Sequence, residues 1–192
     1  MAGDVAGVPE ARGHGAGASR PVGGVAGWVG GVGAATGRPV TADREGGYGE
    51  SAATNARAIA VGVVGCNLED KMRPLADSVR AVEGVVRAAA DEGVTYVLNA
   101  RTDALLLAGD RPRTEVLADA IARGKAYVEA GAAVVFVPGK VTEEEVAALV
   151  DGIGPVSLIP FPGSLPLDRM RELGVQRVSF GPCSHPIPLP PL

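Results

Sequence analysis

The chain has few cysteines, no long apolar run and no strongly basic segment. Only two of its 192 residues are cysteines, too few for a disulfide framework, which favours a reducing, cytoplasmic compartment. No stretch approaches the about 20 apolar residues of a membrane span. The N-terminus lacks the basic-then-apolar order of a secretory signal. With a net charge of −4 and no cluster of Lys and Arg, the sequence predicts no nucleic-acid or membrane partner.

Composition divides the chain into three parts. Twelve of the first forty residues are glycine, and the last eleven residues contain five prolines. Such segments lack the apolar periodicity of packed structure. We therefore expect residues 1–25 to be low-complexity and disordered, 26–181 to form one domain, and 182–192 to be a Pro-rich tail.

Within the central part, short Val-rich runs alternate with helical patterns. Apolar residues at spacings of three and four predict a helix around 79–89. A second helix is expected over about 114–129, with Leu117 and Ile121 facing inward. Thr142 and Glu145 form a capping box for a third helix. A fourth is expected between Pro166 and Gly174. The six runs that we interpret as buried strands are 39–43, 61–67, 95–100, 133–138, 155–160 and 176–180.

Strand-helix alternation predicts parallel strands with right-handed crossovers, an α/β fold. Six strands suit an open doubly wound sheet, and they equally suit an eight-stranded barrel that lacks two units. The pattern alone leaves both architectures open.

Charged residues stand at the ends of three predicted strands. Asp43 and Glu45 belong to the first, Glu69 to the second and Arg101 to the third. Because the carboxyl ends of parallel strands meet on one face, we expect these side chains to gather there. Carboxylate ligands with open positions suit Mg²⁺, and a planar guanidinium suits a carboxylate or phosphonate. The sequence therefore predicts a site for a divalent cation and an anion.

Each of these residues also has a structural interpretation. Arg101 can be the counter-ion of Glu69, and Asp103 can cap the turn after its strand. As a set, clustered carboxylates repel one another, which favours a functional reason for them. The segment 46–49 can be a flexible turn, but we interpret it as a loop that lets backbone approach a ligand.

Five stretches resemble the isocitrate lyase/phosphoenolpyruvate mutase superfamily in wording, order and spacing. They are PVTADREGGYG (39–49), GVVGCNLED (62–70), VLNARTDA (97–104), AYVEAGAAVVFVPG (126–139), and PVSLIPFPG with LGVQRVSFGP (155–182). The resemblance covers about 155 of the 192 residues. It implies a modified TIM-barrel-like fold and dependence on Mg²⁺ or Mn²⁺. It also implies a lyase or mutase that cleaves or forms a C–C or P–C bond in a small 2-oxo or 2-hydroxy acid through a metal-stabilised enolate.

The same resemblance implies roles for individual residues. The metal ligands would be Asp43, Glu45 and Glu69, and the catalytic residues Arg101 and Glu69. The residues that would bind the small anionic substrate are Arg101, Asn99, Gly46, Gly47 and Tyr48. Intact members of the family are expected to be homo-oligomers.

The sequence departs from the family pattern at three places. The first 25–35 residues match neither of the family's first two βα units, and the final helices have no counterpart. We therefore expect a barrel truncated at both ends, with about six of eight strands. Glu69 and Asp70 run directly into Lys71, without the Lys-Lys-Cys-Gly-type loop of true isocitrate lyases. The alternative functions are a catalytically incompetent barrel and a metabolite-binding module that retains the anion site.

Overall fold

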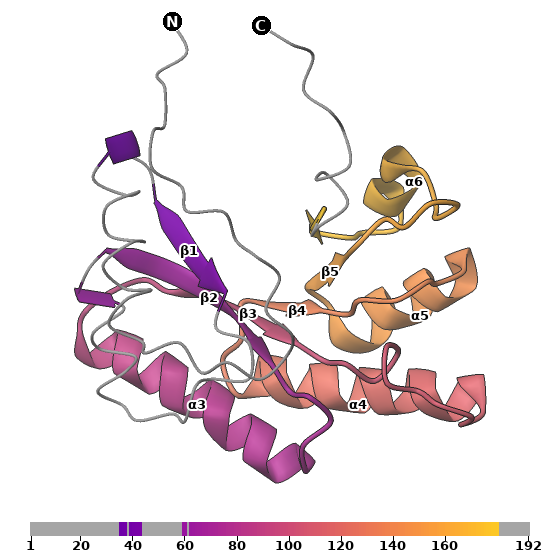
Figure 1. The fold of residues 1–192 in the computed structure, drawn as a ribbon, viewed down its shortest axis with the longest axis horizontal. Helices are drawn as coiled ribbons and strands as arrows, with labels where there is room; N and C mark the ends of the chain where they lie inside the picture. Colours follow the sequence, from indigo (N-terminus) through magenta and orange to yellow (C-terminus); the bar gives the residue numbers. More distant parts are fainter. Residues whose placement is uncertain (1–34, 38, 44–58, 61, 181–192) are drawn as a thin grey trace, which may run out of the picture.

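The computed structural model describes residues 35–37, 39–43, 59–60 and 62–180. Six parallel strands form one sheet in the order β1-β2-β3-β4-β5-β6. The sheet curls into a half-barrel that carries its helices on one side (Figure 1). The strands are β1 Val40–Asp43, β2 Val63–Glu69, β3 Val97–Arg101, β4 Val134–Phe136, β5 Val156–Leu158 and β6 Arg177–Val178. The longer helices are α3 Leu75–Asp91, α4 Arg113–Glu129, α5 Glu143–Ile153 and α6 Leu167–Glu172.

This architecture confirms the barrel-like fold and all six expected strands. Each strand lies within a few residues of its predicted run, and the second extends two residues further, to Glu69. The predicted parts 1–25 and 182–192 lie outside the described residues, so the division into three parts stays a prediction. In the part of the chain that the structure describes, no helix has the length and apolar character needed to cross a membrane.

The core lies between the sheet and the helices. Alternate strand residues point outward into it, as the period of two requires: Leu68, Leu98, Val135 and Leu158 are buried there. The helices contribute mostly Val, Ala and Leu to the same cluster, including Val82, Val85, Val116, Val146 and Leu149. The intervening strand residues, such as Glu69 and Arg101, must therefore face the inside of the curl.

The buried stripe of α4 differs from the one predicted. Leu117 and Ile121 are only half-buried, while Val116, Ala120 and Tyr127 are buried. Ile121 instead packs beside Gly152 of α5, where a Cβ atom would lie 2.6 Å from the Ile121 Cγ2 atom. The apolar residues of α4 therefore pack against α5 as well as against the sheet. The spacing of apolar residues in the sequence does not distinguish the face that contacts α5 from the face that contacts the sheet.

The capping box at the start of α5 is present as predicted. The Thr142 Oγ1 accepts a hydrogen bond from the Glu145 amide at 3.3 Å, and the Glu145 Oε2 accepts one from the Thr142 amide at 2.9 Å. Arg113 at the start of α4 donates to both carboxylate oxygens of Glu145, at 2.6 and 2.8 Å. The same carboxylate thus closes one helix end and ties two helices together.

Replacing Glu145 with glutamine is expected to lower the free energy of unfolding by about 1 kcal/mol near neutral pH. The hydrogen bond from Arg113 is the main cause that holds the pKa of the Glu145 carboxyl below its ordinary value of 4.5. Because the folded pKa is the lower one, this stabilisation is present above pH 4.5 and is lost as the pH falls through the folded pKa. Urea unfolding at several pH values measures the difference. Glu115→Gln, on the exposed first turn of α4, is the control. A difference that persists undiminished at pH 2 would contradict this explanation.

Candidate active site

Strand pairing brings the described members of the predicted site, Asp43, Glu69, Asn99 and Arg101, onto the inner face of the half-barrel. Paired residues on neighbouring strands point to the same side of a sheet. One row joins Asp43 to Asn67 and Asn67 to Asn99 across β1, β2 and β3. The next row, nearer the carboxyl edge, joins Glu69 to Arg101. The structure therefore places these residues in two adjacent rows, as the charged strand ends predicted.

Arg101 lies between two carboxylates. Its Nη1 is 2.5 Å from the Glu69 Oε1, and its Nε and Nη2 are both 2.7 Å from the Asp103 Oδ1. The guanidinium carbon lies 6.0 Å from the ring centroid of Phe136 on β4, a cation–π distance. Four contacts thus orient a side chain that keeps 24% of its surface exposed. Arg101 is the counter-ion of Glu69, and its remaining N–H groups are available to an anion.

Asp103 has a different role from the expected cap. Its Oδ1 binds Arg101, and its Oδ2 accepts a hydrogen bond from the Lys71 amide at 3.1 Å. Two residues beyond Arg101, it points to the same side of the chain. The Asp103 carboxylate is therefore bound by Arg101 and by the loop after the neighbouring strand, while the turn that follows in sequence meets its backbone, where the Leu107 amide donates to the Asp103 carbonyl at 2.8 Å.

The electrostatics of Glu69 fit a site for a cation. Burial raises the pKa of the Glu69 carboxyl above its ordinary value, and the charges of Asp103 and Asp43 raise it further. Arg101 and Lys71 act in the opposite direction. A carboxylate that is destabilised by burial and by like charges gains from a bound cation.

Asn99 adds a neutral oxygen on the same inner face, in the row that contains Asp43. It is 1% exposed, and its Nδ2 donates to the Asn67 Oδ1 at 2.6 Å. Its buried Oδ1 has no hydrogen-bond partner among the described residues. Buried polar atoms normally have one. Together with Asp43 and Glu69, this oxygen is a donor of the hard type that Mg²⁺ prefers, so the residues present fit such an ion.

Several predicted site residues lie outside the described residues: Glu45, Gly46, Gly47 and Tyr48. Within the described ranges, no three Asp, Glu, His or Cys side chains are arranged to hold a metal ion. The predicted three-carboxylate set therefore stays a prediction, with Asp43 and Glu69 as its two described members.

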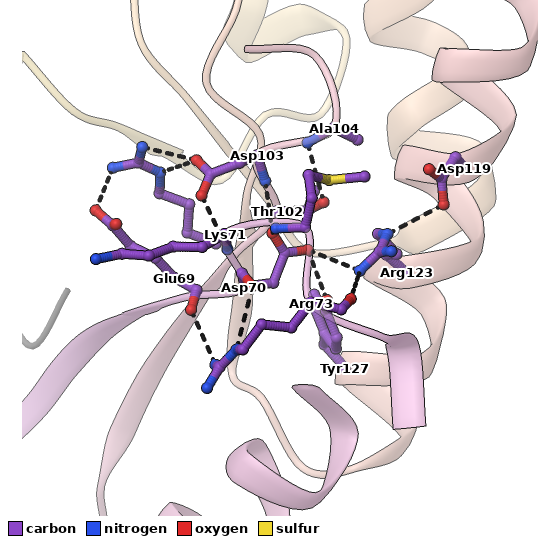
Figure 2. A network of polar contacts seen from close by, with 12 residues as sticks. Glu69, Asp70, Lys71, Arg73, Thr102, Asp103, Ala104, Asp119, Arg123 and Tyr127 are labelled. Carbon is purple, nitrogen blue, oxygen red and sulfur yellow. Dashed lines mark hydrogen bonds and ion pairs between the residues drawn. The ribbon is translucent and has the colours of Figure 1, made fainter. Parts of the chain in front are cut away.

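The sequence did not predict a second group of residues at this edge, centred on Asp70. Asp70 follows Glu69 but points to the opposite, helix-covered side, where it is 2% exposed. Tyr127 donates to its Oδ2 at 2.7 Å, and the Arg123 Nη1 does so at 3.3 Å (Figure 2). An Arg and a Tyr four residues apart on the buried side of a helix were the available signal.

The loop after β2 has an unusual backbone conformation, and the carboxylates of Asp70 and Asp103 accept hydrogen bonds from its amides. Lys71 and Met72 have φ angles of 47° and 55°, a left-handed conformation that is costly for residues other than glycine. The Lys71 amide donates to Asp103, and the Met72 amide donates to the Asp70 Oδ1 at 3.0 Å. Strain of this kind persists only where the surroundings determine it strongly.

Comparisons with known proteins found relatives of the chain. Residues 6–187 match the profile of the family described as phosphoenolpyruvate phosphomutase. Uncharacterized proteins from two strains of Mycobacterium tuberculosis are 35% identical to the chain over 145 residues, 74% of this chain and 54% of theirs. The chain thus spans about half the length of these curated relatives.

Solved structures give the same picture. A "putative phosphonomutase" from Burkholderia cenocepacia superimposes with a TM-score of 0.80 at 33% identity, covering 86% of this chain and 71% of that one. Oxaloacetate acetylhydrolase, solved in complex with its product oxalate, has a TM-score of 0.69 at 23% identity. That alignment covers 83% of this chain and 59% of the other, and it shows a shared fold alone.

Proposed function

Because this chain belongs to the phosphoenolpyruvate phosphomutase family, and is homologous to phosphonomutases and lyases, we propose that it acts on a small anionic acid at the inner carboxyl edge. The proposed reaction cleaves or forms a C–C or P–C bond in a 2-oxo or 2-hydroxy acid. The observation that carries the proposal is the guanidinium of Arg101, held by Glu69 and Asp103 with part of its surface exposed.

In this proposal Arg101 binds the anionic end of the substrate. Its contacts to Glu69 and Asp103 fix the plane of the guanidinium before a ligand arrives. Preorganised donors lower the cost of ordering on binding. Two carboxylates around one guanidinium leave a local negative charge, so the site needs a further positive charge to receive an anion.

Mg²⁺ or Mn²⁺ is the proposed source of that charge. Asp43 and Glu69 would hold the ion, together with Glu45, and Asn99 offers a neutral oxygen beside them. When bound, the ion supplies positive charge where negative charge develops on the substrate oxygens. Glu69 must be ionised to bind it, and Arg101 favours the ionised form.

Calorimetry of the purified chain tests the proposal. We expect oxalate, a small dicarboxylate, to bind in the presence of Mg²⁺ or Mn²⁺ and not in the presence of EDTA. Asp43→Asn is expected to weaken metal binding by at least about tenfold, since even partners of the outer shell are worth roughly 10–100-fold.

Asp168→Asn is the matched control, because this carboxylate lies on α6 with 83% of its side chain exposed. Absence of a binding signal with millimolar metal and oxalate would overturn the proposed function. Turnover assays with 2-oxo and 2-hydroxy acids then separate an enzyme from a metabolite-binding module.

A further inference from the structure

Two side chains of α4 reach the site from the helix-covered side of the sheet. Tyr127 is 1% exposed and Arg123 is 8% exposed, and both bind the same oxygen of Asp70. Arg123 also donates to the Arg73 carbonyl and the Asp119 carboxylate, both at 3.0 Å. Burial, with the adjacent charge of Asp70, raises the pKa of the Tyr127 hydroxyl, which therefore stays protonated and donates its hydrogen. These contacts fix one oxygen of the Asp70 carboxylate, Oδ2.

The other oxygen of the Asp70 carboxylate, Oδ1, binds backbone at the edge of the site. It accepts hydrogen bonds from the amides of Met72 and Asp103, each at 3.0 Å. Asp103 in turn holds Arg101 and the Lys71 amide. Figure 2 shows Asp70 between the α4 side chains and Asp103. A continuous chain of hydrogen bonds therefore runs from Tyr127 and Arg123, through Asp70 and Asp103, to Arg101.

We propose that Tyr127 and Arg123 are positioning residues for the anion site: they fix Asp70, which fixes the backbone of Asp103 and thereby the guanidinium of Arg101. The role of Arg101 as anion binder rests on the proposed function. The positioning itself is a property of the chain without ligand.

Three features favour positioning over simple filling of the core. Two consecutive residues at the end of β2 point to opposite sides of the sheet: Glu69, the last residue of the strand, faces the inner side, and Asp70, the next residue, faces the helix side. The Asp70 carboxylate accepts four hydrogen bonds, two from side chains of α4 and two from backbone at the site edge. The left-handed turn at Lys71 and Met72 depends on the same carboxylates.

The test compares Tyr127→Phe with the unmodified chain. This change removes one hydrogen bond to Asp70 and keeps the ring. We expect oxalate affinity in saturating Mg²⁺ to fall about tenfold. The affinity for Mg²⁺ alone should change less than about twofold, since the Tyr127 hydroxyl binds Asp70 on the helix-covered side, whereas Asp43 and Glu69 face the inner side of the sheet. Arg123→Met should also lower the oxalate affinity and leave the Mg²⁺ affinity nearly unchanged. Arg123→Lys should retain part of the oxalate affinity that Arg123→Met loses.

A second readout needs no ligand. The Nε–H of Arg101 is held by Asp103, so its exchange with water, followed by ¹⁵N NMR, reports on that contact. We expect faster exchange in Tyr127→Phe. Tyr96→Phe is the matched control, because Tyr96 precedes β3 at the opposite end of the sheet and should leave exchange and oxalate affinity unchanged.

The outcomes separate this inference from the proposed function. Unchanged exchange of the Arg101 Nε–H in both Tyr127→Phe and Arg123→Met would overturn the positioning role, whether or not oxalate binds. A lower melting temperature with unchanged exchange and affinity would show packing only and would also overturn it. Faster exchange in a chain that never binds metal and oxalate would support positioning and refute the proposed function.

Discussion

Replacing Arg101 with lysine is expected to weaken oxalate binding in the presence of Mg²⁺ by about 100-fold, or roughly 2.7 kcal/mol. Lysine keeps the charge but loses the planar arrangement of donors. A single ammonium group cannot contact Glu69 and Asp103 in the present geometry and also meet both oxygens of a carboxylate. Calorimetry at fixed Mg²⁺ concentration measures the change.

The matched control is Arg113→Lys. Arg113 also makes a two-pronged contact with a carboxylate, that of Glu145, but it joins two helices outside the inner rows. Its replacement should leave oxalate affinity within about twofold. If Arg101→Lys did the same, the guanidinium would be a structural counter-ion of Glu69 and the proposed anion site would be wrong.

The second large effect is expected on stability. Asp70→Asn should lower the free energy of unfolding by about 3 kcal/mol. The amide group presents N–H donors where the carboxylate accepted hydrogen bonds, and Arg123 is left largely buried with less compensating charge. Removing one partner of a buried charged pair is costly for this reason. Urea unfolding followed by circular dichroism measures the loss.

Asp119→Asn provides the comparison for this variant. Asp119 contacts the same guanidinium of Arg123 at 3.0 Å, but 26% of its side chain is exposed. Solvent screens such a pair, so the expected loss is about 1 kcal/mol or less. Equal losses for the two variants would show that Asp70 is no more important to the fold than a surface carboxylate.

Much of the fold was predictable because it depends on local patterns. Short Val-rich runs alternate with helical periods, and that alternation requires parallel strands. The Thr142 and Glu145 box was visible in sequence because its two residues are three apart and bind each other's backbone. The charged strand ends were informative because parallel topology alone brings Asp43, Glu69 and Arg101 to one edge of the sheet.

The errors have a common origin. Asp103 was interpreted as a cap for its own turn, but its carboxylate binds Arg101 and a loop 32 residues away. The inward face predicted for α4 did not distinguish contacts with the sheet from contacts with α5. In each case the residue type limited the kinds of contact that were available, but the contact partner belonged to another element of the fold.

By itself, the sequence determined the strand-helix alternation, the capped start of α5, and the side of the sheet at which charge collects. These follow from residue spacing and from the rules of parallel strand connection. Only the tertiary structure decided which carboxylates hold Arg101, and that Asp70 connects them to Tyr127 and Arg123, which lie 57 and 53 residues away. Partners so distant in the chain are selected by packing of α4 against the sheet, and no local pattern encodes that packing.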